Sequence, residues 1–103
     1  MPPLADERQT VGAFLERWLE DCHRTKVRPS TYVRSAQIMR DHLAPHIGRI
    51  RLAKLTPADV QRLVNSLHAS GLSAKSVANI HGVLRSALNQ AVRWGDLARN
   101  VAT

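Results

Sequence analysis

A chain of 103 residues, 44% of them hydrophobic, is long enough for one domain with a modest core. Its single cysteine, Cys22, excludes an internal disulfide, and no apolar run approaches the ~20 residues that span a bilayer, so we expect a soluble cytoplasmic protein without membrane contact. Fifteen Lys and Arg against eight Asp and Glu give a formal net charge of +7, which favours a polyanionic partner, DNA above all.

The first predicted helix starts at Thr10 and fades before Pro29, because the residue that precedes a proline disfavours helix. Residues 1–9 are expected to form a flexible N-terminus. The apolar residues of this helix are spaced by three and four, which places them on one buried face: Val11, Phe14, Leu15, Trp18, Leu19 and Cys22.

The second predicted helix spans residues 31–44. A hydroxyl residue after Pro29 can cap its start, and Pro45 with Gly48 ends it. Four residues are expected to face inward: Tyr32, Ala36, Met39 and Leu43. Residues 47–55 then alternate apolar and basic side chains, which predicts a short extended segment between the second and third helices.

Thr56, Pro57 and Asp59 form a strong start for the third helix, with a hydroxyl cap, a proline in the first turn and an acid three residues after the cap. Its buried side is predicted to hold Val60, Leu63, Val64 and Leu67, and Gly71 ends it. The fourth helix is capped by Ser73, runs to about Trp94 and is closed by Gly95. We therefore predict an all-α, compact four-helix bundle over residues 10–95, with 96–103 as the start of a linker.

The fourth helix carries a polar stripe without acids. On a wheel of about 100° per residue, one face is apolar, with Val77, Ile80, Leu84, Ala87, Leu88 and Ala91. The opposite face holds Lys75, Asn79, Gly82, Ser86, Asn89 and Arg93, with Arg85 on its shoulder. Because a solvated helix face usually mixes Glu with Lys, this stripe favours contact with DNA, where Lys and Arg bind phosphates or guanine and Asn pairs with adenine. An ordinary polar surface is the alternative interpretation.

The start of the second helix shows a weaker version of the same pattern. Its predicted contacts are Arg28, Ser30, Thr31, Arg34 and Gln37, which combine positive charge, hydroxyls and the free amides of a helix start. Simple N-capping is the alternative role of Ser30 and Thr31. Arg49, Arg51 and Lys54 form a third basic cluster, which we interpret as solvated surface.

We predict no catalytic, cofactor-binding or metal-binding residue in this chain. The five histidines have no zinc-ligand spacing, and His42 and His46 would share a helical face only if the helix continued past Pro45. Cys22, Trp18 and Trp94 are helix-spaced with apolar residues, so we expect all three in the core.

The order and spacing of several segments resemble the N-terminal core-binding domain of phage integrases and related tyrosine recombinases, a SAM-like four-helix domain. The resemblance runs from about Val11 to Asn100 and depends on Phe14-Leu15-Glu16-Arg17-Trp18, Ser30-Thr31-Tyr32, His42 to Gly48, Leu55 to Val60, Gly71-Leu72-Ser73 and Leu84 to Gly95. Two positions depart from the family pattern. Ser35 stands where a large aromatic or aliphatic residue is frequent, which predicts looser packing, and Val101 follows Asn100 where proline is common.

The resemblance implies an orthogonal helical bundle that forms one half of a C-shaped clamp around the core of an attachment-site duplex. Its second and fourth helices would face the major groove, with contacts from Thr31, Lys75, Asn79, Ser86 and Arg93. A catalytic domain joined after about Asn100 would close the clamp and perform the chemistry. The isolated domain is expected to be a monomer that supports DNA integration and recombination without catalysing it.

Two other functions fit parts of the pattern. A helix-turn-helix transcriptional regulator fits the third and fourth helices around Gly71, although about twenty residues is long for a recognition helix. A helical protein-interaction module would use the basic face to bind an acidic protein, and binding to random duplex DNA would separate it from the other two.

Overall fold

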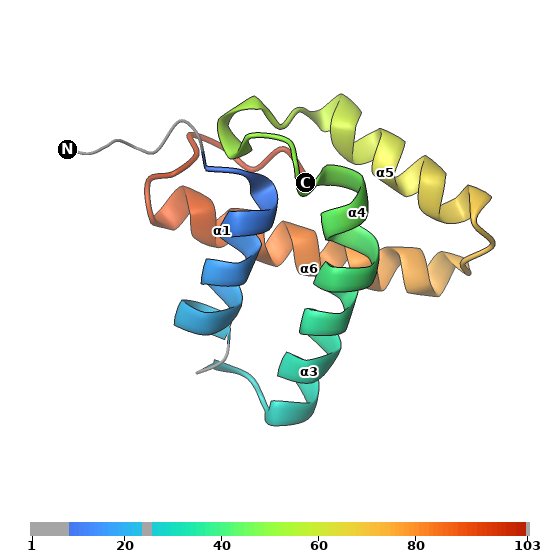
Figure 1. Ribbon diagram of the computed structural model, residues 1–103, viewed down its shortest axis with the longest axis horizontal. Helices are drawn as coiled ribbons and strands as arrows, with labels where there is room; N and C mark the ends of the chain where they lie inside the picture. Colours follow the sequence, from blue (N-terminus) through green and yellow to red (C-terminus); the bar gives the residue numbers. More distant parts are fainter. Residues whose placement is uncertain (1–8, 24–25, 103) are drawn as a thin grey trace.

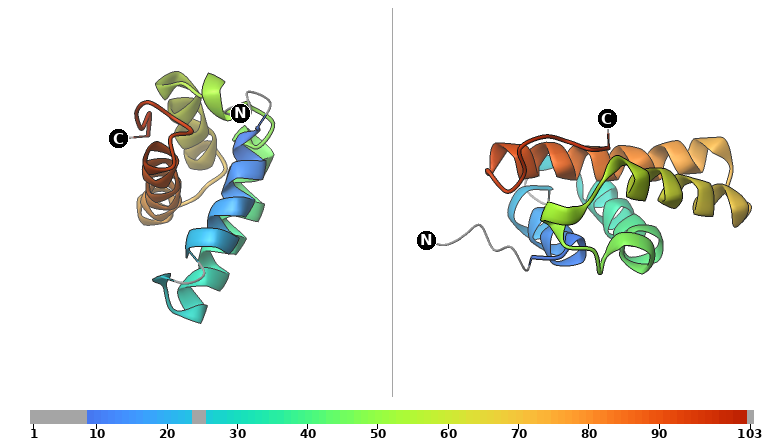
Figure 2. Two further views of the ribbon diagram at one scale, coloured as in Figure 1. Left: turned by 90° about the vertical axis from the view of Figure 1, so that its left-hand side faces the viewer. Right: turned by 90° about the horizontal axis from the view of Figure 1, so that it is seen from above.

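The computed structural model describes residues 9–23 and 26–102, without the side chains of residues 22 and 23. In this part of the chain, helices pack in two layers that cross at a steep angle (Figures 1 and 2). One layer consists of α1 (Val11–Trp18) with the π-helical turn η1 (Leu19–His23), and of the continuous segment α3 (Pro29–Ile38), η2 (Met39–Leu43) and α4 (Ala44–Ile47). The other consists of α5 (Pro57–Ala69) and α6 (Ala74–Arg93). The predicted all-α orthogonal bundle is confirmed.

The first helix starts where the sequence predicts, at a Thr10 cap whose Oγ1 accepts a hydrogen bond from the Ala13 amide at 3.1 Å. Thr10 also forms an isolated antiparallel bridge with Arg51. The Leu52 amide donates to the Gln9 carbonyl at 2.8 Å, so Gln9 already belongs to the folded domain. Residues 1–8 and the Cys22 side chain, on which other predictions were made, lie outside the described residues.

The predicted extended segment is short. Arg51 is extended and bridges Thr10. Ile50 lies in a bend beside the start of α1, where its carbonyl accepts from the Val11 amide at 2.8 Å. From Leu52 the chain turns into the 3₁₀ helix η3 (Leu52–Lys54) and buries the Leu52 side chain. No strand forms among the described residues.

The predicted start of the second helix was wrong. The helix begins at Pro29, with Arg28 as its N-cap and no side-chain cap. A proline suits the first helical position because its fixed φ is already helical and it has no N–H to satisfy. Ser30 and Thr31 therefore lie in the first turn as exposed residues and do not cap the helix.

The predicted end of the second helix was also wrong, because the helix passes through Pro45 to Ile47. The Ala44 amide bonds to the Met39 carbonyl, five residues back, so this turn is wider than an α-helical one. The wider turn accommodates the proline ring, which in a regular helix clashes with the preceding turn. The Gly48 amide then bonds to the Ala44 carbonyl at 3.0 Å and closes the segment.

The start of α5 confirms the predicted capping box. The Thr56 hydroxyl accepts from the Asp59 amide at 3.2 Å, and the Asp59 carboxylate accepts from the Thr56 amide at 3.0 Å. The hydrogen bond from the Thr56 backbone lowers the pKa of Asp59 below its usual 3.8, assisted by the Thr56 hydroxyl and by Arg62, against an opposing effect of desolvation.

Both α5 and α6 end in the same way, at glycines with positive φ: Gly71 at 95° and Gly95 at 83°. At the end of α6 the Asp96 amide bonds to the Ala91 carbonyl at 2.8 Å, the long hydrogen bond of a Schellman motif. Glycine adopts this left-handed conformation without a steric penalty, which explains why both predicted helix ends are confirmed.

One apolar core joins the two layers. The buried faces predicted for α1, α5 and α6 are confirmed, as is the inward position of Met39 and Leu43 on the second helix. Ser35 is also buried, at 4% exposure, at the position where the sequence predicted looser packing. Each fully buried Leu or Phe of this core contributes about 1.5–3 kcal/mol through its removal from water.

Trp94 is not a core residue as predicted. It is the C-cap of α6, is 38% exposed, and contacts the Phe14 ring edge-on at a centroid distance of 5.8 Å. The Arg17 guanidinium lies 4.7 Å from the Trp94 ring centroid and pairs with the Asp96 carboxylate. This cluster ties the end of α6 to α1.

Residues 96–102, which we call the C-terminal strap, run back along α6 (Figure 2). Ala102 is buried, and Leu97 and Val101 pack against the core. The strap is thus part of the packed structure, and the prediction that this segment begins a linker to a further domain stays a prediction.

Candidate nucleic-acid interface

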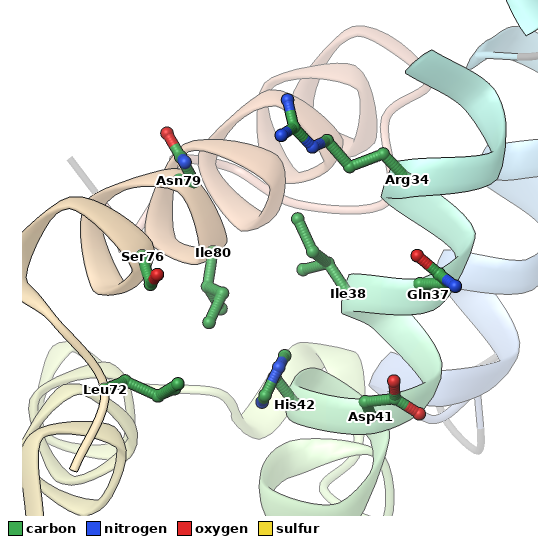
Figure 3. A pocket seen from close by; sticks show the side chains of 9 residues that line it. All are labelled: Arg34, Gln37, Ile38, Asp41, His42, Leu72, Ser76, Asn79 and Ile80. Atoms are coloured by element: carbon green, nitrogen blue, oxygen red, sulfur yellow. The ribbon is translucent and has the colours of Figure 1, made fainter. Parts of the chain in front are cut away.

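A groove of about 260 Å³ separates the second helical segment from the first half of α6. Its apolar floor comes from Ile38, Leu72 and Ile80, and Figure 3 shows Ile38 and Ile80 on its two sides. Ile38 and Ile80 reach the groove because each helix turns its apolar stripe toward the core, and Leu72 reaches it from the turn between α5 and α6. The groove is the place where the two helices singled out by the sequence approach each other.

The groove brings together three of the predicted DNA contacts. Arg34 extends from α3 toward α6, Asn79 projects from α6, and Gln37 lines the α3 side (Figure 3). All three are exposed, and none forms a hydrogen bond or an ion pair with another described residue. Their polar atoms are therefore available to a ligand.

Lys75 lies one helical turn before Asn79 on the same exposed side of α6, beyond the residues that line the groove. Within the described part of the chain it has no acidic partner. At the other side, the exposed residues Arg28, Ser30 and Thr31 occupy the cap and first turn of α3. The first-turn amides have no partner within the helix, so they remain donors for an anion.

The remaining predicted contacts on α6 lie far from the groove. Ser86, Asn89 and Arg93 are exposed, but Arg93 follows Asn79 by about 21 Å at the helical rise of 1.5 Å per residue. Two of them have internal partners. The Asn89 Oδ1 accepts from the Asn100 side chain at 2.7 Å, and one Arg93 nitrogen lies 3.5 Å from the Gln90 Oε1.

Sequence reasoning did not place Asp41, His42 and Ser76 at the site, although all three line the groove. Asp41 is exposed and forms no ion pair with a described residue, so the groove is not uniformly basic. Asp41 could have been found from the sequence, because it follows Gln37 by four residues and shares the outward face of the helix. No signal marked Ser76, because its position depends on the crossing of two helices distant in sequence.

The third basic cluster is exposed, as expected for solvated surface. Arg49, Arg51 and Lys54 lie around η3, at the top of Figure 1, whereas the start of α3 lies at the bottom. Because of this separation, the cluster can serve as a control surface that carries the same sign of charge.

The described residues contain neither a cluster of potential metal ligands nor a helix that could span a membrane. Because the helix continues past Pro45, His42 and His46 lie one turn apart, contrary to the predicted helix end, but no group of three or more potential ligands gathers in the described part of the chain. Within the same residues, no helix combines the length and the apolar character needed to cross a bilayer.

Comparison with known proteins places this geometry in a family. The family model of the phage integrase N-terminal SAM-like domain matches residues 10–68. The chain is 26% identical over 95 residues to the tyrosine recombinase XerC-like protein of Caldanaerobacter subterraneus subsp. tengcongensis, a match that covers 91% of this chain and 24% of that protein. The chain thus spans about a quarter of the length of this relative.

Two solution structures have the same fold. The integrase-like domain from Bacillus cereus superposes with a TM-score of 0.89 at 31% identity, covering 100% of this chain and 84% of that one. The phage integrase SAM-like domain from Moorella thermoacetica gives a TM-score of 0.80 at 40% identity, covering 97% and 86%. The chain belongs to the phage integrase N-terminal SAM-like domain family, as the sequence resemblance implied.

Proposed function

We propose that this chain binds duplex DNA at the core of an attachment site and supports site-specific recombination without performing the cleavage and rejoining itself. The observation that carries the proposal is the groove between α3 and α6, which Arg34, Gln37 and Asn79 line without hydrogen-bond or ion-pair partners among the described residues. The family membership favours this function over a transcriptional regulator or a protein-interaction module.

The chemistry of the groove suits the edges and backbone of a duplex. Arg34 and Lys75 supply the positive charge that phosphates require, and an arginine also forms a bidentate pair with guanine. Gln37 and Asn79 carry amides, which pair with the N6 and N7 atoms of adenine. Asp41 repels phosphates but accepts a hydrogen bond from the amino group of cytosine, so base edges fit this side of the groove better than backbone.

The net charge of +7 supports the same partner, because much of the affinity of a basic domain for DNA comes from the release of counterions. We infer that the catalytic residues belong to a separate domain of a longer protein. The recombinase relative, of which this chain matches 24%, has the length for such a domain.

Fluorescence anisotropy with a labelled random-sequence duplex tests the proposal. If about four to six phosphates are neutralised, log K falls against log salt with a slope of about −4 to −5. An Arg34→Ala, Lys75→Ala variant removes one charge of the groove and the neighbouring charge on α6, and it should weaken binding and flatten the slope by about 1.8.

The matched control is Arg49→Ala with Lys54→Ala, which removes the same charge from the exposed cluster around η3. This control variant should keep most of the affinity for DNA and most of the slope of log K against log salt. Absence of binding at low salt, or an equal loss in both variants, would contradict the proposed interface. Stronger binding of an acidic protein than of duplex DNA would support the interaction module instead.

A further inference from the structure

The side chain of Asn100, in the C-terminal strap, is hydrogen-bonded through both ends of its amide. Its Nδ2 donates to the Arg85 carbonyl at 2.9 Å and to the Asn89 Oδ1 at 2.7 Å, while its Oδ1 accepts from the Ala102 amide at 2.8 Å. Ala102 is 1% exposed, so the strap around Asn100 is anchored in the core. A residue of the strap therefore holds one of the predicted DNA contacts on α6.

The two backbone partners fix the orientation of the Asn100 amide. The Ala102 N–H can only donate and the Arg85 carbonyl can only accept, so the Oδ1 of Asn100 must face the first and its Nδ2 the second. The same Nδ2 then meets Asn89, whose amide must offer its oxygen. The strap thereby determines which end of the Asn89 amide is turned inward.

From this geometry, and given the proposed function, we infer that Asn100 is a positioning residue that makes Asn89 a hydrogen-bond donor toward DNA. Adenine recognition by an asparagine needs the Oδ1 and the Nδ2 to face the base edge together. The Oδ1 of Asn89 keeps a second lone pair, but it is turned toward the strap, so the group that Asn89 presents outward is its NH₂. The partner of Asn89 is then an acceptor-only group of the duplex: a phosphate oxygen, or the O6 or N7 of guanine.

Asn79 and Asn89, both predicted as DNA contacts on one face of α6, therefore differ in the atoms that they offer to DNA. Asn79 has no hydrogen bond with a described residue and keeps both ends of its amide for an adenine. Asn89 is limited by Asn100. The two residues should therefore affect sequence preference in different ways.

Selection from a randomised duplex pool with the wild-type chain, Asn100→Ala, Asn89→Ala and the double variant tests the inference. Asn100→Ala frees the Asn89 Oδ1 and should create a preference of about tenfold for adenine at one position, within the range of a bidentate amide–adenine pair. The added Asn89→Ala should abolish that preference. In the wild-type background, Asn89→Ala should remove no adenine preference.

One further comparison distinguishes a phosphate acceptor from an acceptor on a base. A loss of affinity in Asn89→Ala that is uniform across sequences assigns a phosphate oxygen. A loss that disappears when one guanine is replaced by 7-deazaguanine, which lacks the N7 acceptor, or by 2-aminopurine, which lacks the O6, assigns the base. An adenine preference that the wild type already shows, that Asn89→Ala abolishes and that Asn100→Ala leaves unchanged would overturn the inference. Failure of the wild-type chain to bind any duplex would instead overturn the proposed function on which it rests.

A readout without DNA guards against misfolding of Asn100→Ala. In the free wild-type chain, the side-chain NH₂ of Asn100 should exchange slowly with solvent, and Asn89→Ala should shift its NMR resonances. Exchange as fast as that of the exposed Asn65 side chain, without any shift in Asn89→Ala, would contradict the hydrogen bond itself.

Discussion

The two ends of α6 are alike in sequence and different in structure. The end that includes Lys75 and Asn79 faces a groove, and these two side chains have no hydrogen-bond or ion-pair partners among the described residues. The end that includes Asn89 and Arg93 is occupied by the strap, by Gln90 and by the nearby cluster of Arg17, Trp94 and Asp96.

An acid-free stripe on one helix is therefore not a single binding surface. Exposure is similar along the whole stripe, but the availability of hydrogen-bonding atoms is not. We therefore propose that the groove end makes the principal DNA contact and that the strap end has a positioning role. Four experiments test this division, in order of decreasing effect.

Leu84→Ala should remove the support that both ends share. Leu84 is fully buried between them, so truncation leaves a cavity and costs about 2–5 kcal/mol of unfolding free energy. Urea denaturation followed by circular dichroism measures the loss. A cost below that of an exposed control such as Arg85→Ala would show that the layers do not pack as described.

Arg17→Ala should loosen the strap end alone. It removes the contact with the Trp94 ring and the ion pair with Asp96, a combined loss of about 1–2 kcal/mol for a partly exposed site. Hydrogen exchange should accelerate at the end of α6 and in the strap. DNA affinity at the groove should remain within about twofold of wild type, because Arg17 does not line the groove and its charge is already paired with Asp96. A large loss of affinity would place DNA at this end.

Lowering the pH should reduce the stabilisation that the capping box gives to α5. This helix leads into the groove end of α6. The pKa of Asp59 is depressed in the folded chain by its hydrogen bonds with Thr56, so its contribution is complete above the unfolded value of about 3.8 and is lost as the pH falls through the folded value. The cap is worth about 1 kcal/mol. Asp59→Asn is the control, because it lacks the titrating carboxylate, and its unfolding free energy should not show this loss below about pH 4. The same pH dependence of the unfolding free energy in both proteins would contradict the assignment.

Gly82→Ala tests the middle of the stripe and should have the smallest effect. A Cβ at this position meets no atom within 4 Å, so the gain in helix propensity should stabilise the chain by about 0.5–1 kcal/mol. Thermal unfolding measures this gain. Destabilisation would indicate that the outer face of α6 is covered.

Most of the fold follows from local sequence signals. The capping box at Thr56, the Ser73 cap and the two helix-ending glycines act within a few residues of the chain, so they were predictable. The end of the second helix was not. The π-helical turn that accommodates Pro45 depends on a register change that composition does not encode.

The candidate site was predictable in its residues but not in its partners. The wheel identified Lys75, Asn79 and Asn89 as exposed, because apolar periodicity defines the opposite face. It could not show that Arg34 reaches across a groove toward α6 or that Asn100 holds Asn89, since those contacts join segments distant in sequence. Trp94 was misplaced for the same reason: its contacts with Phe14 and Arg17 come from another helix.

The most direct test compares equal losses of charge at the two ends. Salt-dependent binding to a random-sequence duplex is measured for Arg34→Ala with Lys75→Ala, and for Arg85→Ala with Arg93→Ala. The groove pair should flatten the slope of log K against log salt by about 1.8, and the strap-end pair by less than about 0.9. Equal flattening by both pairs, or a larger effect of the strap-end pair, would contradict the assignment of the groove as the principal DNA contact.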